Sequence, residues 1–183
     1  TVTLALFALY RRSLGRSLPA VSARPAAPLT DRVLLGAAVF CAALPLVSAT
    51  STLAKLSMEW LGIPISQQEI ADLFATAHSP WLLMALTGAA VVVVPIGEEL
   101  LFRAGIFRIS MRYLPRWAAL LLSATAFALL HSNTVHFAPL LVLGIVFTLA
   151  YERTGSLLVP VIAHGLFNLN SIVRILAGVG GTS

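Results

Sequence analysis

The chain has 183 residues, of which 58% are hydrophobic and 10% are charged, and its mean hydropathy is +0.93. A soluble domain carries about a quarter of charged residues, so this composition excludes one. It also excludes disorder, because so apolar a chain has ample surface to bury. Apolar runs near the ~18–20 residues that cross a bilayer recur along the chain. We therefore expect an all-α fold, a polytopic transmembrane helix bundle with about five to six membrane segments, forming a single membrane-embedded domain over residues 1–183.

The basic residues and the single cysteine restrict the partners. The formal net charge is +5, but most of the twelve basic residues lie between apolar runs, where lipid headgroups would meet them. We expect the lipid bilayer, and no nucleic acid, as a partner.

Cys41 is the one cysteine, which excludes an intramolecular disulfide and a thiolate metal cluster. Eleven arginines to one lysine, with abundant alanine, indicate a bacterial protein, and the apolar runs a multi-pass protein of the inner (plasma) membrane.

The N-terminal third is expected to hold one full membrane segment. Residues 1–32 combine a partial helix, Val2–Tyr10, with a basic loop from Arg11 to Arg32. The Val2–Tyr10 stretch lacks a charged leader and a cleavage-like site, so it does not resemble a secretory signal. Val33–Ala54 is the first full span, with Pro45 as a kink that neighbouring helices can tolerate.

An acidic segment, Lys55–Ser79, is expected outside the membrane, with a short amphipathic helix from about Ser66 to Ala77. The positive-inside rule places this segment outside the cell. The same rule places the Arg11–Arg32 loop, the hairpin at Leu114 and the Glu152–Ser156 turn in the cytoplasm.

A long helix begins at Ser79-Pro80-Trp81, where Ser is a helix cap, Pro favours the first helical position and Trp suits the headgroup level. It continues to the break at Leu114-Pro115. The further predicted spans are Trp117–His131, Phe137–Tyr151 and Leu157–Leu176.

Three charged residues interrupt the apolar part of this long helix: Glu98, Glu99 and Arg103. Charges inside a bilayer are costly unless they are paired or wet. Glu99 and Arg103 are four residues apart and share one helical face, so they can pair, whereas Glu98 lies ~100° further around and can face a neighbouring helix. One arginine cannot neutralise two carboxylates, so the second needs water, a proton or a metal.

Two more polar pairs at helical spacing lie in apolar spans: Phe127 with His131, and His164 with Asn168. At ~1.5 Å per helical residue, Glu98 and His131 each lie about 21–22 Å from the Leu114 hairpin. His164 and Asn168 lie ~14 and ~20 Å beyond Gly155. The clusters can therefore converge inside the bundle.

These residues resemble the motifs of the CPBP (CAAX protease and bacteriocin-processing, or Abi) intramembrane proteases. Glu98-Glu99-x-x-x-Arg103, Phe127-x-x-x-His131 and His164-x-x-x-Asn168 follow the family's three patterns in the family's order. The resemblance covers roughly Trp81 to Ile175. It implies a catalytic core over residues 80–176.

What the resemblance implies is hydrolysis of a peptide bond of a membrane-associated protein or peptide by an activated water. Glu98 would be the general base, and His131 would position or polarise the water. His164 and Asn168 would donate to the oxyanion. Arg103 would support Glu98, with Glu99 as a partner of Arg103 and Phe127 as the accompanying motif residue.

Zinc is an alternative, with Glu98, His131 and His164 as ligands and an open fourth position. We favour a mechanism without metal and commit to no cofactor, because the sequence offers no obvious acidic partner for either imidazole. The other alternative is a catalytically silent membrane protein, acting as a scaffold, an immunity factor or a subunit of a larger membrane assembly. His136, in the expected Ser132–His136 loop, is taken as a bystander.

Overall fold

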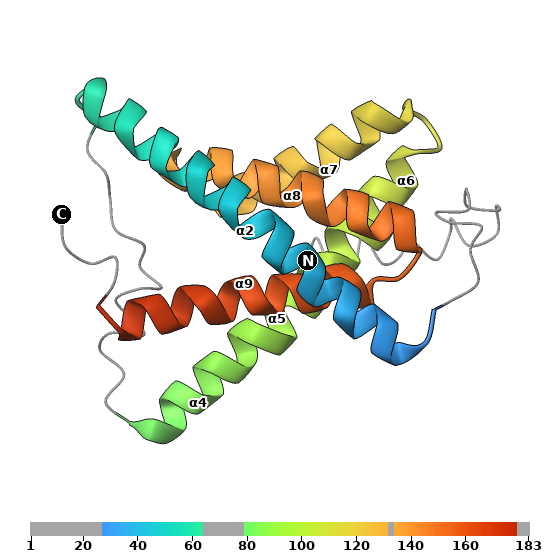
Figure 1. The fold of residues 1–183 in the computed structure, drawn as a ribbon. Coiled ribbons are helices and arrows are strands. Elements are labelled where there is room, and N and C mark those ends of the chain that lie inside the picture. Colours follow the sequence, from blue (N-terminus) through green and yellow to red (C-terminus); the bar gives the residue numbers. More distant parts are fainter. Residues whose placement is uncertain (1–26, 64–78, 132–133, 179–183) are drawn as a thin grey trace.

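The computed structural model describes residues 27–63, 79–131 and 134–178, and the regular elements in these ranges are all helices (Figure 1). The prediction of an all-α bundle is confirmed. Four helices are long and apolar enough to cross a membrane, and Arg116–Leu130 is a shorter apolar helix. These five helices match the lower predicted number. The Val2–Tyr10 stretch, most of the Arg11–Arg32 loop and the Ser66–Ala77 helix lie outside the described residues.

Helix α2 spans Leu29–Trp60, further in both directions than the predicted Val33–Ala54. Its 32 residues make it ~48 Å long, against ~30 Å for a hydrocarbon core. Lys55 therefore belongs to a helix and does not begin a loop, which corrects the prediction. Hydropathy alone ended the predicted span too early, because Lys is a good helix former in spite of its charge. The helix ends at Trp60, and Gly62 beyond it has a φ of +67°, which suits a left-handed C-terminal cap.

The long central helix runs from Pro80 to Ser110. Ser79 stands at its N-cap and Pro80 at its first position, as predicted. The rod comprises α4 (Pro80–Gly88), η1 (Ala89–Val93), α5 (Val94–Glu99), η2 (Leu100–Phe107) and α6 (Arg108–Ser110). The η1 and η2 segments are π-helical, which the sequence did not predict. Turns of this kind are rare and recur at functional sites.

The last three helices are α7 (Arg116–Leu130), α8 (Thr134–Thr154) and α9 (Leu158–Leu176), close to the predicted bounds. Helix α8 begins earlier than predicted, so His136 lies in its first turn and not in a loop. Helix α7 has 15 residues and is ~22 Å long, shorter than the hydrocarbon thickness of ~30 Å. If its first residue lies at headgroup level, His131 at its other end lies at the depth of the membrane interior.

Small residues bring the helices close together. A Cβ on Gly144 of α8 would lie 3.0 Å from the Cα of Ala124 on α7, and one on Gly36 of α2 would lie 2.7 Å from the Cβ of Ile162 on α9. Small residues at such crossings are typical of membrane helix packing. Helix α2 lies across α8 and α9 (Figure 1), and the three share one buried cluster. Its members are Ala43, Leu143, Phe147, Ala163 and Phe167.

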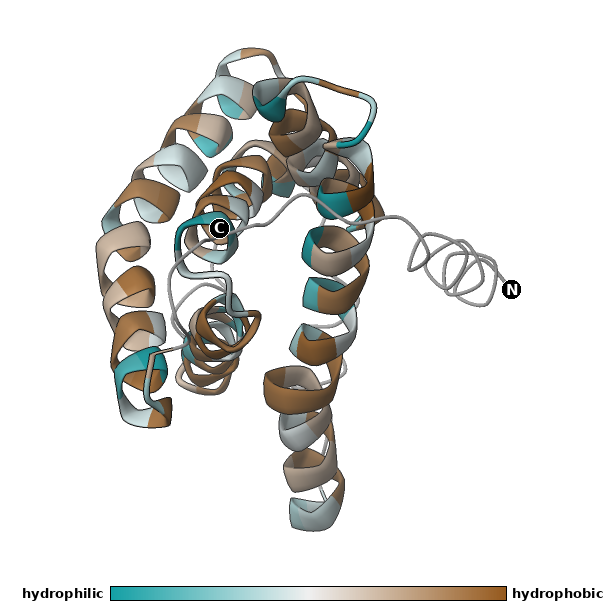
Figure 2. Cartoon of the chain, turned by 90° about the vertical axis from the view of Figure 1, so that its right-hand side faces the viewer, coloured by the Kyte–Doolittle hydropathy of each residue, from teal (hydrophilic) through white to brown (hydrophobic). Residues whose placement is uncertain are grey.

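The outer faces of the helices are apolar. Large hydrophobic side chains are exposed along α2, along the Pro80–Ser110 rod and on α7, for example Leu53, Val93 and Leu122. Figure 2 shows hydrophobic residues recurring along the length of the helices. A lipid environment covers such faces without cost, so the surface agrees with a membrane-embedded bundle.

Candidate active site

The predicted pair of Glu99 and Arg103 is present and completely buried. Arg103 Nε lies 3.0 Å from Glu99 Oε2, and neither side chain has any exposed surface. The π-helical turn η2 carries Arg103 directly after α5, which ends at Glu99. A pair of opposite charges at this spacing shares one helical face, which is why the sequence could predict it.

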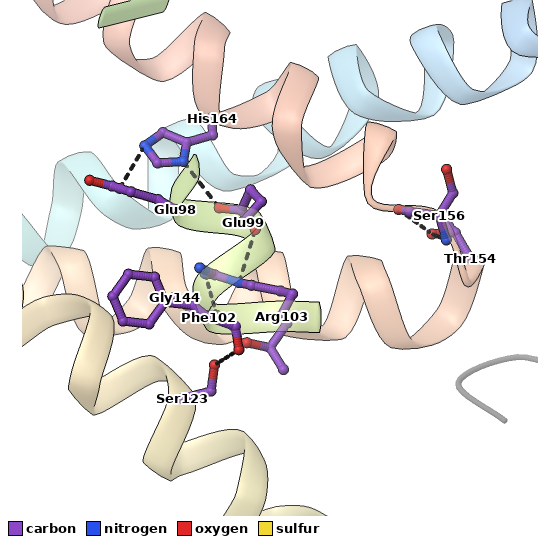
Figure 3. Close-up of polar contacts among 10 residues, drawn as sticks. Glu98, Glu99, Phe102, Arg103, Ser123, Gly144, Thr154, Ser156 and His164 are labelled. Carbon is purple, nitrogen blue, oxygen red and sulfur yellow. Dashed lines mark hydrogen bonds and ion pairs between the residues drawn. The ribbon is translucent and has the colours of Figure 1, made fainter. Parts of the chain in front are cut away.

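Aromatic rings enclose the Arg103 guanidinium. Its Cζ lies 4.7 Å from the ring centroid of Phe127, 5.4 Å from that of Phe147 and 5.9 Å from that of Phe102. One Nη2–H of Arg103 also donates to the Gly144 carbonyl at 3.2 Å (Figure 3). Cation–π contacts of this kind are strongest where water is excluded. The motif residue Phe127 therefore helps to hold the charge of Arg103.

His164 lies between the two adjacent glutamates (Figure 3). Its Nδ1 is 3.0 Å from Glu99 Oε1, and its Nε2 is 3.6 Å from Glu98 Oε2. An ionised carboxylate can only accept hydrogen bonds, so Nδ1–H of His164 donates to Glu99. The prediction that Glu98 faces a neighbouring helix is confirmed, because His164 belongs to α9.

Glu99 is an acidic partner of a motif imidazole, which the sequence analysis did not find. The argument against zinc from the lack of such a partner was therefore wrong for His164. The partner lies 65 residues earlier in the chain, and no spacing rule connects residues so far apart. Glu99 contacts both Arg103 and His164, so its role is wider than the predicted support of Arg103.

His131 lies at the C-terminal end of α7 and contacts Phe127. Its Nδ1 is 3.0 Å from the Phe127 carbonyl oxygen, and the two ring centroids are 5.0 Å apart. The Phe127 ring also lies 5.7 Å from the ring of His164. Phe127 thus contacts both motif imidazoles as well as Arg103. The structure brings Glu98, Glu99, Arg103 and His164 together, with His131 connected to them through Phe127.

Asn168 lies one turn after His164 and faces the central helix. Its Nδ2–H donates to the Ala90 carbonyl at 2.8 Å, in the π-helical turn η1. Gly165 allows this approach, because a Cβ there would lie 2.6 Å from the Val91 carbonyl oxygen. An amide nitrogen carries two donors, so the bond to Ala90 fixes the group and leaves one N–H. Neither Ala90 nor Gly165 carried a signal in the sequence.

The arrangement of the motif residues differs from that of a zinc site. Within residues 27–63, 79–131 and 134–178, no group of three or more His, Cys, Asp or Glu side chains is placed to hold a metal ion. Catalytic zinc needs three protein ligands around one point. In this arrangement Glu98, His131 and His164 do not form that set, and we derive no step through a metal.

A family model described as Type II CAAX prenyl endopeptidase Rce1-like matches residues 73–170. The chain belongs to this Rce1-like family, and the resemblance to CPBP proteases is confirmed. The matched residues contain all three motifs and both π-helical turns. No solved structure matches the chain with significance.

Two bacterial relatives agree with the family match. The UPF0177 protein YbdI of Lactococcus lactis is 30% identical over 111 residues, which are 60% of this chain and 58% of that protein. A Bacillus subtilis protein named "Putative membrane peptidase YdiL" is 31% identical over 88 residues, 48% of this chain and 36% of that protein. The chain spans about half the length of the curated relatives it matches. Together with the apolar helices, these matches support a multi-pass bacterial membrane protein.

Proposed function

We propose that the protein is an intramembrane endopeptidase in which Glu98 activates the water that attacks a peptide bond. The observation that carries this proposal is the position of His164 between Glu98 and Glu99, with Glu99 bound to Arg103. If this cluster only held helices together, we would expect Glu98 to form a tight hydrogen bond with His164, whereas Glu98 Oε2 lies 3.6 Å from His164 Nε2.

The two glutamates differ in exposure, which assigns them different roles. The Glu99 side chain is 0% exposed and carries two charged contacts, so it is an anchor. The Glu98 side chain is 17% exposed, and 3.6 Å from Oε2 to His164 Nε2 is longer than a hydrogen bond. Glu98 is thus the carboxylate that a water and a substrate can reach.

The reaction proceeds by general base and then general acid catalysis. Glu98 takes a proton from the water as its oxygen attacks the carbonyl carbon, and the carbonyl becomes an oxyanion. Glu98 then gives the proton to the amide nitrogen as the C–N bond breaks and the carbonyl re-forms. His131, at the end of α7, orients the water. The reaction consumes one water and releases a carboxylic acid and an amine, so no further reactant is needed.

His164 and Asn168 stabilise the oxyanion. With Nδ1–H donated to Glu99, a protonated His164 has Nε2–H available for the substrate, and the second N–H of Asn168 is available as well. Losing one donor of this type costs about 2.7–4 kcal/mol of transition-state stabilisation.

The substrate class follows from the surroundings. Residues 80–176 form the catalytic core, and the exposed faces of its helices are apolar, so a substrate reaches it from the membrane. We propose a membrane-associated protein or peptide as substrate and the bacterial inner membrane as the location.

The test compares protein termini, by mass spectrometry, in membranes from cells that carry the wild type or Glu98→Gln. Glu59→Gln is the matched control, because Glu59 is exposed near the end of α2 and outside the cluster. We expect specific cleaved termini to disappear in Glu98→Gln alone, at equal protein levels. If all three sets of termini coincide at good expression, the protein is not a protease, and a silent scaffold, immunity or subunit role takes its place.

A further inference from the structure

Four arginines gather at one end of the bundle, away from the candidate active site. We call this the arginine surface; its members are Arg116 and Arg153, which are exposed, and Arg108 and Arg112, which are half-buried. The surface joins the turn between α6 and α7 to the end of α8. A buried cluster of Phe107, Ala119, Leu120 and Tyr151 holds these three parts of the chain together.

The arginine surface carries a formal excess of positive charge. Glu152 is the one acidic residue between positions 104 and 157. Arg116 binds both of its carboxylate oxygens, with 2.6 Å between Arg116 Nη2 and Glu152 Oε2. The four arginines and Glu152 together have a formal net charge of +3.

Exposed aromatic and apolar side chains border the arginine surface. Tyr113 is 76% exposed and Trp117 is 66% exposed, and Leu114 and Leu121 are exposed as well. Tyr and Trp are enriched where helices meet lipid headgroups. A phosphate group accepts paired hydrogen bonds from a guanidinium. A bilayer surface can cover the apolar border and neutralise the arginines at the same time, which a soluble acidic partner cannot do.

We infer that the arginine surface binds the phosphate groups of anionic phospholipids in the leaflet at this end of the bundle. By the positive-inside rule this leaflet is the cytoplasmic one. Phosphate contacts there would hold the α6–α7 turn and the end of α8 at a fixed depth. Arg103 belongs to the central helix and Gly144 belongs to α8, and both helices end at this surface. The depth of the candidate site would therefore be fixed as well.

The experiment uses the full chain purified from membranes and reconstituted in bilayers of phosphatidylcholine with a minor share of phosphatidylglycerol. Native mass spectrometry counts the lipids of each kind that stay bound. The variant is Arg108→Gln/Arg112→Gln/Arg153→Gln, which leaves the Arg116–Glu152 pair intact. The control is Arg174→Gln. Arg174 lies in the last turn of α9, whereas the arginine surface lies near the first turn of that helix.

We expect the wild type and Arg174→Gln to retain phosphatidylglycerol roughly tenfold above its share of the bilayer, and the triple variant to lose most of that enrichment. Equal retention in the wild type and the triple variant would overturn the inference. A second result would also overturn it. If inorganic phosphate alone protects the wild type against thermal unfolding as well as phosphatidylglycerol does, the ligand is free phosphate and not a lipid.

Two further arms keep the result interpretable. If the triple variant does not fold, as judged by circular dichroism and size exclusion, the exposed single variant Arg153→Gln replaces it, with a smaller expected loss of enrichment. Glu98→Gln is expected to retain phosphatidylglycerol like the wild type. Lipid binding and proteolysis are thereby tested separately, and either can fail alone.

Discussion

The candidate site has two sides that each contain a glutamate and differ in exposure. The sealed side consists of Glu99 and Arg103, enclosed by aromatic rings and fully buried. The open side consists of Glu98, whose side chain is 17% exposed and lies 3.6 Å from Nε2 of the buried His164. Adjacent glutamates reach different sides because successive helical residues differ by ~100° in direction. One carboxylate therefore anchors the site while its neighbour stays accessible.

Removing the charge of the sealed side should have the largest effect. In Arg103→Met the buried Glu99 loses its counter-charge, and we expect stability to fall by about 3–5 kcal/mol. Thermal unfolding in detergent, followed by circular dichroism, measures this. In the double variant Glu99→Leu/Arg103→Met no charge of the pair is left, so much of the stability should return. If the single and double variants are equally stable, the pair does not act as the anchor.

Changing the open side should remove activity and leave stability unchanged. For Glu98→Gln we expect a loss of about 10²–10⁴-fold in cleavage rate, the usual contribution of a general base. The unfolding temperature should stay near that of the wild type, because Glu98 makes no tight hydrogen bond. Cleavage of a substrate peptide, chosen from the termini lost in cells, gives the rate. A stable Glu98→Gln protein with wild-type turnover would contradict the division between the two sides.

The smallest expected effect comes from the contact that positions α9 on the central helix. In Gly165→Ala the new Cβ would meet the Val91 carbonyl oxygen at 2.6 Å, so α9 or η1 must shift. We expect a loss of about 1–3 kcal/mol in stability together with slower cleavage. Gly88→Ala is the control, since a Cβ there meets nothing within 4 Å. The prediction fails if the two alanine variants are equally stable and equally active.

Comparison of the sequence predictions with the structure shows where spacing rules succeed. The Glu99–Arg103 pair was predicted because both residues belong to one helical face, and so was the helix start at Ser79-Pro80. The hydropathy pattern predicted the membrane spans, but the predicted first span ended before Lys55 and His136 was predicted to lie in a loop. Both errors arose because hydropathy indicates preference for lipid and not helix propensity. The acidic partner of His164 and the Asn168 bond to Ala90 were missed, since they join helices far apart in sequence.

The amino-acid sequence alone was enough to predict the class of the protein, because composition and apolar runs of membrane length admit only a helical bundle in lipid. It also predicted a set of candidate site residues whose depths in the membrane could coincide. The packing of the helices was needed to show which glutamate is buried, that His164 lies between the two, and that three phenylalanines enclose Arg103. These properties depend on how α7, α8 and α9 pack around the π-helical turns of the central helix, and helix periodicity contains no information about contacts between helices.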